Sequence, residues 1–261
     1  MKVAVCIKQV PTRGWQPRLN EAGTWIREQD VTYEMNEPDA YALEEALRLR
    51  ERHGGEVVVC SAGPMRVQQV IREALARGAD RAIHVHADAL AVADAWTVAG
   101  ALAAAMAPEG FDLVLTGLQS DDQGFGQTGV SLAERLGLPH STIIMEIQVE
   151  AGGLRVKREL EGGWFQWVRL PQPALLTIQS GINQLRYATL RGIMASKKKP
   201  IAEVVPSEVP ADGSPASGAP LQRITRLTLP VRTKQTQMLT GSPAAVASEL
   251  VRCLRDEARV L

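Results

Sequence analysis

The chain has 261 residues, 45% of them hydrophobic, which is enough for a substantial core in one large or two small domains. Its 29 Lys and Arg residues balance 29 Asp and Glu residues, which excludes a general electrostatic attraction to nucleic acid or anionic membranes. The three cysteines, Cys6, Cys60 and Cys253, form no CxxC pair, so we expect reduced thiols and no metal site. The opening apolar run is too short for a signal peptide, and no run reaches the roughly 18 residues of a membrane span, so we expect a soluble, cytoplasmic protein.

Strand-like and helical patterns alternate over the first half of the chain. Continuous apolar runs predict strands at residues 2–8, 56–63, 81–86 and 111–117. Helical patterns follow them at residues 42–54, 65–79, 95–107 and 128–137. Strands that are apolar along their whole length and joined by helices indicate a parallel sheet covered on both faces. The predicted fold class is therefore α/β, with a doubly wound, mostly parallel sheet.

The pattern changes after Pro139. Alternating residues and the turn sequences AGG and EGG over residues 141–179 predict antiparallel hairpins that extend the sheet. Residues 206–220 are rich in Pro, Gly, Ser and Ala and predict a flexible or extended linker. A last helix is predicted after the candidate N-cap Ser242, with Pro243 at its first position. Because it carries an apolar stripe, we expect this helix to pack on a neighbour in this chain or in another.

Ligands bind such sheets beyond the carboxyl ends of the strands, where the strand order reverses. The connections of interest therefore follow Lys8, Cys60, His86 and Leu115. The first connection is unusually long, and long loops in compact domains are often functional.

Two of these connections contain polar or small residues at positions that favour a ligand. Asn36 and Asp39 precede a helix, where they either cap its amides or contact the ribose or base of a nucleotide. Ala62 and Gly63 follow a strand, where they either let a ligand approach the backbone or only form a tight turn.

The loop TGLQSDDQGFGQTG, residues 116–129, has four glycines and contains no lysine or arginine. Amides near Gly124, Gly126 and Gln127, together with the N-terminus of the next helix, are suited to hold a phosphate without a basic residue. Asp121 and Asp122 would then accept hydrogen bonds from ribose hydroxyls or an adenine amine. Acid–base or metal chemistry at the two aspartates is the weaker interpretation, because no His or third carboxylate stands nearby in the sequence. A solvated turn is the remaining alternative.

Three further features are weaker candidates for function. His84 and His86 lack a partner at metal-ligand spacing, which favours strand-end packing. The triple lysine at residues 197–199 has no interleaved aromatics, so it is a solvated segment or a docking surface for an acidic partner. Trp164 and Trp167 are expected to pack in the core or at an interface.

The segment RYATLRGIMASKKKPI, residues 186–201, closely resembles the signature of the β subunit of electron-transfer flavoproteins. Collinear similarity covers nearly the whole chain. It includes the segments IKQVP, NEPDAYALEEALRLRE, CSAGP, REALARGADRAIHV, DLVLTGLQSDDQGFGQTG, VKRELEGG and PALLTIQSGIN.

This resemblance implies a function and a set of partners. The β subunit pairs with an α subunit that carries most of the FAD site, and the heterodimer passes electrons from flavin dehydrogenases, such as those oxidising acyl-CoA in fatty acid oxidation, to a membrane quinone oxidoreductase. The β subunit has a Rossmann-like fold of the adenine-nucleotide-binding type and buries one structural AMP. The chain is then expected to be an electron-carrier subunit with no catalytic residues. Neither nucleic acid binding nor membrane insertion is expected.

The resemblance also implies site residues and a domain division. The AMP contacts would be Cys6, Asn36, Glu37, Pro38, Asp39, Ala62, Thr116, Gly117, Leu118, Gln119, Ser120, Asp121, Asp122, Gln123, Gly124, Phe125, Gly126 and Gln127. Residues 188–199 would form a recognition loop, in which Leu190 inserts into the dehydrogenase while Lys197, Lys198 and Lys199 steer the encounter. The expected parts are a nucleotide-binding domain at 1–185, a recognition loop and linker arm at 186–241, and a C-terminal helix at 242–261 that packs on the partner subunit.

Two departures from the commonest family pattern bear on the ligand. The proline usually found two residues after the signature asparagine is replaced in NQLRY, and the glycine-rich loop reads SDDQGFGQ. In electron-bifurcating members, which oxidise NADH, a second FAD replaces AMP and a DGDTAQ run is typical, but that run is absent from this sequence. AMP is therefore the expected ligand, with a second FAD as the alternative. A stand-alone ATP-binding regulatory domain is a third class, which the recognition segment and C-terminal arm disfavour.

Overall fold

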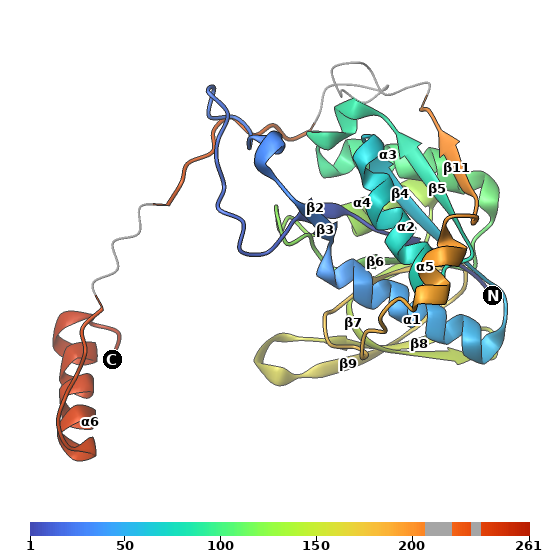
Figure 1. Ribbon diagram of the computed structural model, residues 1–261. Coiled ribbons are helices and arrows are strands. Elements are labelled where there is room, and N and C mark those ends of the chain that lie inside the picture. Colours follow the sequence, from blue (N-terminus) through green and yellow to red (C-terminus); the bar gives the residue numbers. More distant parts are fainter. Residues whose placement is uncertain (207–220, 231–235) are drawn as a thin grey trace. The chain divides into compact units, whose positions relative to one another are not determined.

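A nine-stranded sheet has the order β11-β5-β4-β1-β6-β10-β7-β8-β9 in the computed structural model, which confirms the predicted α/β class (Figure 1). The structure describes residues 1–206, 221–230 and 236–261. These residues divide into two compact units, Met1–Thr225 and Arg226–Leu261, and the sheet belongs to the first.

The strands and helices follow the predicted alternation closely. The strands are β1 Lys2–Cys6, β2 Gln9–Pro11, β3 Tyr33–Met35, β4 Glu56–Gly63, β5 Arg81–His86, β6 Leu113–Gly117, β7 His140–Glu150, β8 Gly153–Glu159, β9 Phe165–Leu170, β10 Ala174–Ile178 and β11 Ile201–Val204. The α-helices are α1 Glu37–His53, α2 Gln68–Arg77, α3 Ala95–Met106, α4 Thr128–Leu136, α5 Leu190–Ser196 and α6 Pro243–Arg252. Short 3-10 turns are η1 Glu28–Asp30, η2 Met65–Val67, η3 Asp88–Ala91, η4 Ala107–Glu109 and η5 Glu161–Gly163.

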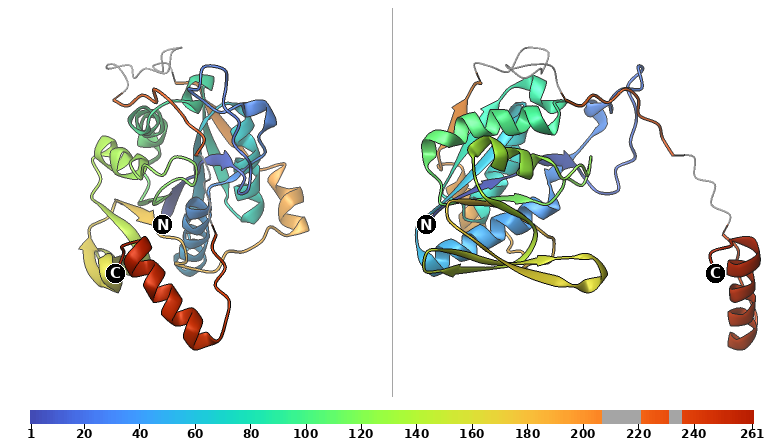
Figure 2. Two further views of the ribbon diagram at one scale, coloured as in Figure 1. Left: turned by 90° about the vertical axis from the view of Figure 1, so that its left-hand side faces the viewer. Right: turned by 180° about the vertical axis from the view of Figure 1, so that it is seen from behind.

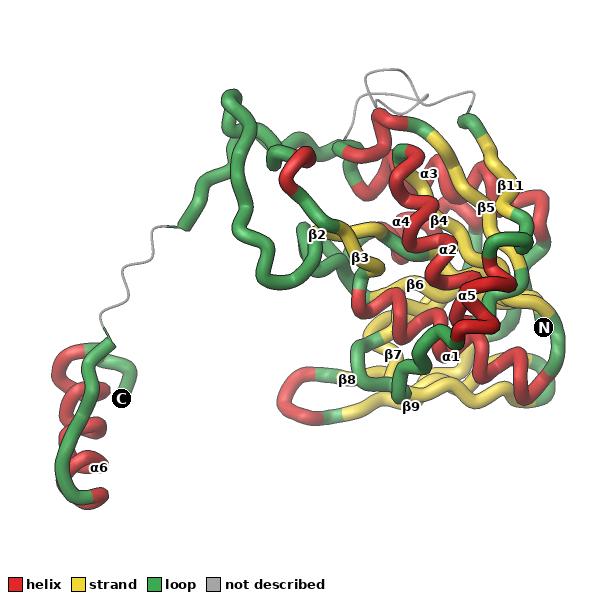
Figure 3. The backbone as a smooth tube through the Cα atoms, in the orientation of Figure 1, coloured by secondary structure: helices red, strands yellow, loops and turns green. Residues whose placement is uncertain are grey.

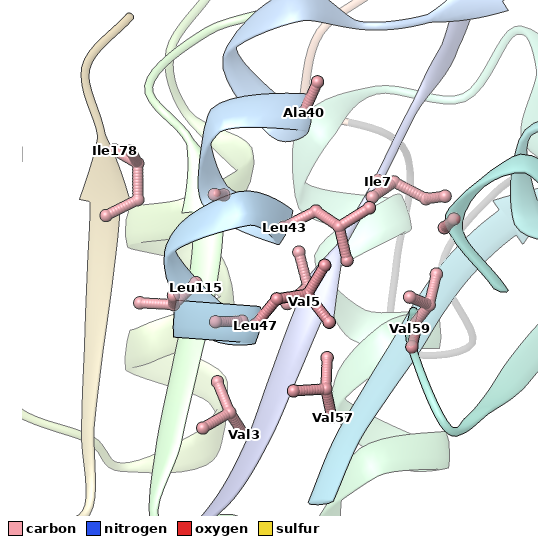
Figure 4. Close-up of a cluster of buried hydrophobic side chains, with 14 of the residues drawn as sticks. Val3, Val5, Ile7, Ala40, Leu43, Leu47, Val57, Val59, Leu115 and Ile178 are labelled. Atoms are coloured by element: carbon pink, nitrogen blue, oxygen red, sulfur yellow. The ribbon is translucent and has the colours of Figure 1, made fainter. Parts of the chain in front are cut away.

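Helices cover both faces of the parallel part of the sheet. Because successive strand residues point to opposite faces, Val3 and Val5 of β1 pack with α1 and α2, while Ala4 and Cys6 pack with α3 and α4. Figure 2 shows these two helical layers on either side of the sheet, and Figure 4 shows Leu43 and Leu47 of α1 among the valines of β1 and β4. This two-sided burial explains why these strands read as continuous apolar runs.

The strand order reverses between β1 and β6. Residues Lys2–Cys6 pair in parallel with β4 on one side, and Val3–Val5 pair in parallel with β6 on the other. After β1 the chain crosses through α1 to β4, and after β6 it crosses through α4 to β7, in opposite directions along the sheet. Their diverging loops create the switch point at which doubly wound folds bind ligands.

The antiparallel extension is confirmed, with one correction. β7, β8 and β9 form an antiparallel meander at one edge of the sheet (Figure 3). The run ALLTI, predicted to belong to the hairpins, instead forms β10, which lies parallel between β6 and β7. All five of its residues are buried, as expected for an internal parallel strand.

Two segments contain strands that the sequence patterns did not predict. β11 pairs in parallel with β5 at the opposite edge of the sheet, in a region where sequence regularity had been lost. The long first connection contains the antiparallel pair β2 and β3, which places the two ends of the connection side by side. Both sets of strands are only three or four residues long, too short to give a periodic signal.

The second unit contains α6, which begins as predicted. Ser242 is its N-cap and accepts a hydrogen bond from the Ala245 amide at 3.3 Å, and Pro243 is its first residue. A π-helical turn, Cys253–Glu257, continues it. The predicted linker at 206–220 lies outside the described residues, apart from Pro206. Among the helices that the structure describes, none has the length and apolar character needed to cross a membrane.

Candidate functional site

A cavity of about 140 Å³ opens at the switch point, beyond the carboxyl ends of β1 and β6. It has a polar wall and an apolar wall. The polar wall comes from Lys8, Asn36, Asp39 and the loop of residues 116–129. The apolar wall comes from Cys6, Ile7, Ala62 and the β5–α3 region, which contributes Leu90, Ala91, Ala93, Ala95, Val98 and Leu102. Such a division suits a ligand that is flat and apolar at one end and polar or charged at the other.

The structure brings most of the predicted contact residues together around this cavity. Those that line it are Cys6, Asn36, Asp39, Ala62, Thr116, Gly117, Leu118, Gln119, Ser120, Asp122, Gln123, Phe125, Gly126 and Gln127. Glu37, Pro38, Asp121 and Gly124 do not belong to the lining. Glu37 and Pro38 begin α1, and Asp121 and Gly124 stand at the turn of the glycine-rich loop.

Asp39 joins three elements at the floor of the cavity. Its carboxylate accepts the Lys8 amide hydrogen at 2.7 Å and the Gly117 amide hydrogen at 2.9 Å, so it links the ends of β1 and β6 to α1. Burial raises the pKa of the Asp39 carboxyl to about 7, although hydrogen bonds from Lys8, Asn36 and Gly117 act in the opposite direction. Of the two interpretations of Asp39, helix capping is wrong, because both carboxylate oxygens bind strand-end amides.

Asn36 holds the glycine-rich loop in place. Its side chain donates to the Gln119 carbonyl at 3.0 Å and accepts the Asp121 amide hydrogen at 2.9 Å. The capping interpretation is therefore wrong for Asn36 as well, since its side chain makes no bond to the helix it precedes. Asn36 is 1% exposed, and these two bonds satisfy the polar groups that burial would otherwise leave unpaired.

The two adjacent aspartates of the loop have separate partners. Asp121 accepts the Glu37 amide hydrogen at the N-terminus of α1, at 3.2 Å, and lies 3.5 Å from the Arg13 guanidinium. It therefore caps α1, the role that Asn36 was expected to have. Asp122 pairs with the Lys8 ammonium at 2.7 Å. The expectation that Asp121 faces the ligand is not supported by its place outside the cavity lining.

Sequence reasoning missed two parts of the site. Lys8 supplies a cation to a loop that has none of its own, and it is the only basic residue that lines the cavity within the described part of the chain. Its position directly after a buried strand was the available signal. The connection after His86 was among the loops of interest, but its apolar contact residues were not predicted, because alanine-rich helix sequence looks the same whether it packs in a core or against a ligand.

The N-terminus of α4 faces the same cavity. Gln127, Thr128 and Gly129 line it, and no side chain of the described residues caps the helix there. The first amides of a helix have no intrahelical acceptor and carry the positive end of the helix dipole. Together with Lys8 they make this end of the cavity suited to an anion.

A second surface is formed by α5, which lies on α2 (Figure 1). Leu190 is 82% exposed, Met194 is 72% exposed and Tyr187 is 93% exposed, so apolar side chains point away from the fold. Lys197 and Lys198 are exposed beside them. This arrangement leaves Leu190 accessible to another protein.

Lys199 does not share this exposure. Its ammonium donates to the carbonyls of Leu75 at 3.0 Å and Ala79 at 2.5 Å, at the end of α2. Burial lowers its pKa. The expectation that Lys199 steers a partner is therefore corrected, because its charge is used to cap α2.

Further contacts hold the α5 segment rigidly against the fold. The Arg72 guanidinium donates to the carbonyls of Ser196 at 2.6 Å and Lys199 at 2.8 Å. Arg186 pairs with Glu44 at 2.7 Å and with Glu51 at 2.6 Å on α1. The exposed side chains are thus presented on a fixed base, which reduces the entropy cost of docking.

The remaining candidates have structural positions. The buried His84 ring lies 3.0 Å from the Gly63 carbonyl, and His86 contacts Glu203 on β11, in line with strand-end packing. Trp164 is 74% exposed, so the core interpretation is wrong for it, and the Arg155 guanidinium stacks on Trp167 at 4.3 Å. Among the described residues, no cluster of three His, Cys, Asp or Glu side chains is arranged to hold a metal ion.

Comparison with known proteins gives consistent matches. The model of the electron transfer flavoprotein domain matches residues 23–209. A protein of Methylophilus methylotrophus named electron transfer flavoprotein subunit beta is 36% identical over 261 residues, which cover 98% of each chain. Proteins of the same name occur in Bradyrhizobium diazoefficiens, 36% identical over 264 residues and all of both chains, and in Homo sapiens, 38% identical over 216 residues, 81% of this chain and 84% of the human one.

Proposed function

The chain belongs to the electron transfer flavoprotein family as a β subunit, and on that basis we propose that it holds one AMP in the switch-point cavity while its partner carries the redox flavin. As a β subunit it forms a heterodimer with an α subunit. The heterodimer accepts electrons from flavin dehydrogenases of the acyl-CoA type and passes them towards a quinone oxidoreductase. This chain contributes binding surfaces and completes the FAD site of the α subunit.

The division of the cavity into two walls is the observation that carries the AMP proposal. Leu90, Val98 and Leu102 offer apolar surface for an adenine ring. The polar part of the lining offers Lys8 and the uncapped N-terminus of α4 to a phosphate. One cation and one helix N-terminus suit a single phosphate that is bound and never transferred.

The exposed face of α5 supports the docking part of the proposal. A large exposed leucine, with the exposed Met194 on the same helix and the exposed Tyr187 three residues before it in the sequence, suits insertion into an apolar pocket of a dehydrogenase. Lys197 and Lys198 lie where they would speed encounter with an acidic partner. The anchor is small, so the rest of the carrier is free to reorient between partners.

The decisive experiment is a count of the nucleotides released from the denatured heterodimer. Chromatography with absorbance at flavin and adenine wavelengths should give one FAD and one AMP per heterodimer. Two FAD and no AMP would replace this proposal with the bifurcating alternative, in which a second FAD occupies the cavity and NADH is the donor. One FAD and no second nucleotide would remove the binding role of the cavity.

A further inference from the structure

The Lys8 ammonium reaches across the cavity mouth to the glycine-rich loop. Its Nζ lies 2.7 Å from Asp122 Oδ1, 3.1 Å from Gln123 Oε1 and 3.3 Å from Ser120 Oγ. These three oxygens match the three protons of the ammonium group. The cation that lines the cavity is therefore already satisfied within the protein.

The backbone of Lys8 is held by hydrogen bonds, while its side chain is partly exposed. The Lys8 amide donates to Asp39 at 2.7 Å, and its carbonyl accepts the Asn36 amide hydrogen at 2.9 Å. The side chain of Lys8 is 40% exposed and that of Asp122 is 22% exposed. An ion pair with this exposure contributes little net free energy, so a stronger anion can take its cation at small cost.

Asp122 has a second donor that remains when the lysine leaves. The Gln123 amide hydrogen is donated to Asp122 Oδ1 at 2.8 Å. The carboxylate is also partly exposed, so water can replace the lost ammonium. Exchange of the lysine between Asp122 and a ligand therefore leaves no buried charge without a partner.

We propose that Lys8 is the phosphate-selecting residue of this cavity, and that Asp122 competes with the phosphate of the nucleotide for its ammonium. The inference rests on the proposed nucleotide-binding function and names the residue pair that sets its preference for a phosphorylated ligand. Lys8 strengthens binding of AMP and has little effect on adenosine. Asp122 weakens AMP binding, because its pair with Lys8 must open before the phosphate can use the cation.

The two residues therefore have opposite effects, which a simple packing role would not produce. If Lys8 only shaped the cavity, its replacement would weaken AMP and adenosine equally. If Asp122 contacted the ribose, its replacement would weaken both ligands. Competition for one ammonium predicts that the Asp122 variant binds AMP more tightly while its affinity for adenosine stays the same.

The test compares AMP with adenosine in the heterodimer, denatured to release its nucleotides and refolded with FAD. Dissociation constants are measured by calorimetry for the wild type, Lys8→Met and Asp122→Asn. Lys2→Met is the matched control, because Lys2 stands at the other end of β1 and pairs with Glu109 at 2.8 Å in the same way.

Lys8→Met should weaken AMP binding by at least about tenfold and adenosine binding by less than about twofold, as expected for loss of a charge-assisted hydrogen bond. Asp122→Asn should tighten AMP binding several-fold and leave adenosine binding unchanged. Lys2→Met should leave both constants as in the wild type.

Two outcomes would overturn the assignment. Equal weakening of AMP and adenosine in Lys8→Met would show that Lys8 does not select the phosphate, and weaker AMP binding in Asp122→Asn would exclude the competition. Failure of the proposed function looks different, because the wild type itself would then bind neither AMP nor adenosine, or would retain FAD in their place.

Discussion

The Asp39 carboxylate accepts the Gly117 amide hydrogen at 2.9 Å, and the approach is so close that it leaves no room for a β-carbon on residue 117. This contact joins the first turn of α1 to the end of β6 at the floor of the cavity. The glycine is required there by space and not by backbone conformation, since Gly117 is absent from the positive-φ residues of the chain. The position of Asp39 thus depends on a residue 78 positions away in the sequence.

Gly117→Ala should destabilise the fold and reduce nucleotide binding together. The added methyl group would meet Asp39 Oδ1, the Asp39 amide and the Pro38 side chain, so α1 or β6 must move. Overpacking of this kind costs about 1 to 3 kcal/mol, to which weakening of the Asp39 bond adds. Urea unfolding and the AMP content of the purified heterodimer are the measurements.

Gly100→Ala is the control for this substitution. Its nearest neighbour is the guanidinium of Arg135, the far end of a long side chain and not backbone, and the residue lies inside α3. Stability should change by less than about 1 kcal/mol, with AMP content unaffected. If Gly100→Ala loses as much stability and AMP as Gly117→Ala, the contact between residue 117 and Asp39 does not set the cost.

The stability contribution of Asp39 should depend on pH in a defined direction. The folded-state pKa of about 7 lies above the unfolded value, so the native state holds the proton more tightly. The contribution is fully present below about pH 4 and is lost as pH rises through about 7. The stability difference between wild type and Asp39→Asn should therefore shrink over that range, by on the order of a few kcal/mol. Urea titrations at a series of pH values measure it.

Glu109→Gln provides a comparison in which the pKa of the replaced carboxyl is shifted in the opposite direction. Hydrogen bonds from Arg81 and Lys2 lower the pKa of Glu109 to about 2. Its contribution is present above the unfolded pKa and is lost as pH falls towards 2, so the stability difference from wild type should be constant around neutral pH and shrink only under acidic conditions. A wild-type difference from Asp39→Asn that is constant between pH 4 and pH 8 would contradict the raised pKa of Asp39.

Arg186→Met should cost about 2 to 3 kcal/mol of folding free energy. Although burial raises it, hydrogen bonds from Arg186 and Arg48 hold the pKa of Glu44 below its ordinary value, and the Glu44 side chain is only 4% exposed. Loss of Arg186 leaves that carboxylate short of a partner, which is costly for a buried charge. Chemical denaturation measures the loss, and hydrogen exchange should show faster opening of residues 186–199.

Arg169→Met is the matched control for Arg186→Met. Arg169 pairs with Glu150 at 3.2 Å, but its side chain is 78% exposed. Exposed pairs contribute about 0 to 1 kcal/mol, so this variant should unfold close to the wild type. Equal losses in the two variants would mean that burial of Glu44 does not set the cost.

Leu190→Ala should slow reduction of the heterodimer by a flavin dehydrogenase and leave FAD and AMP content intact. Truncation of an interface anchor typically costs about 2 kcal/mol or more of binding, which corresponds to a rise of roughly thirtyfold in the dehydrogenase concentration needed for half-maximal rate. Stopped-flow reduction at increasing dehydrogenase concentration measures it. Leu221→Ala is the control, because Leu221 is 73% exposed but lies outside α5. Unchanged kinetics in Leu190→Ala would remove the anchor assignment.

The local pattern of apolar residues in the sequence predicted most of the strands and helices of the fold. β4 and β5 have the predicted bounds, and α3 and α4 begin at the predicted residues, because buried parallel strands and alanine- or leucine-rich helices have strong periodic signals. β10 was assigned to the hairpins because a five-residue apolar run carries no information on strand direction. β11 was missed because a four-residue edge strand depends on its neighbour β5 for its formation.

The sequence by itself determined the fold class, the positions of the strand-end loops and, through the signature segment, the family. Only the tertiary structure decided which polar group serves which partner. It assigned Asp121 to the N-terminus of α1, Asn36 to the glycine-rich loop, and Lys199 to the end of α2. It also brought Lys8 to a loop that has no cation of its own. The physical reason is that periodic burial is a local property of the chain, whereas a hydrogen-bond partner is set by distances across the fold, here between residues 84 to 120 positions apart.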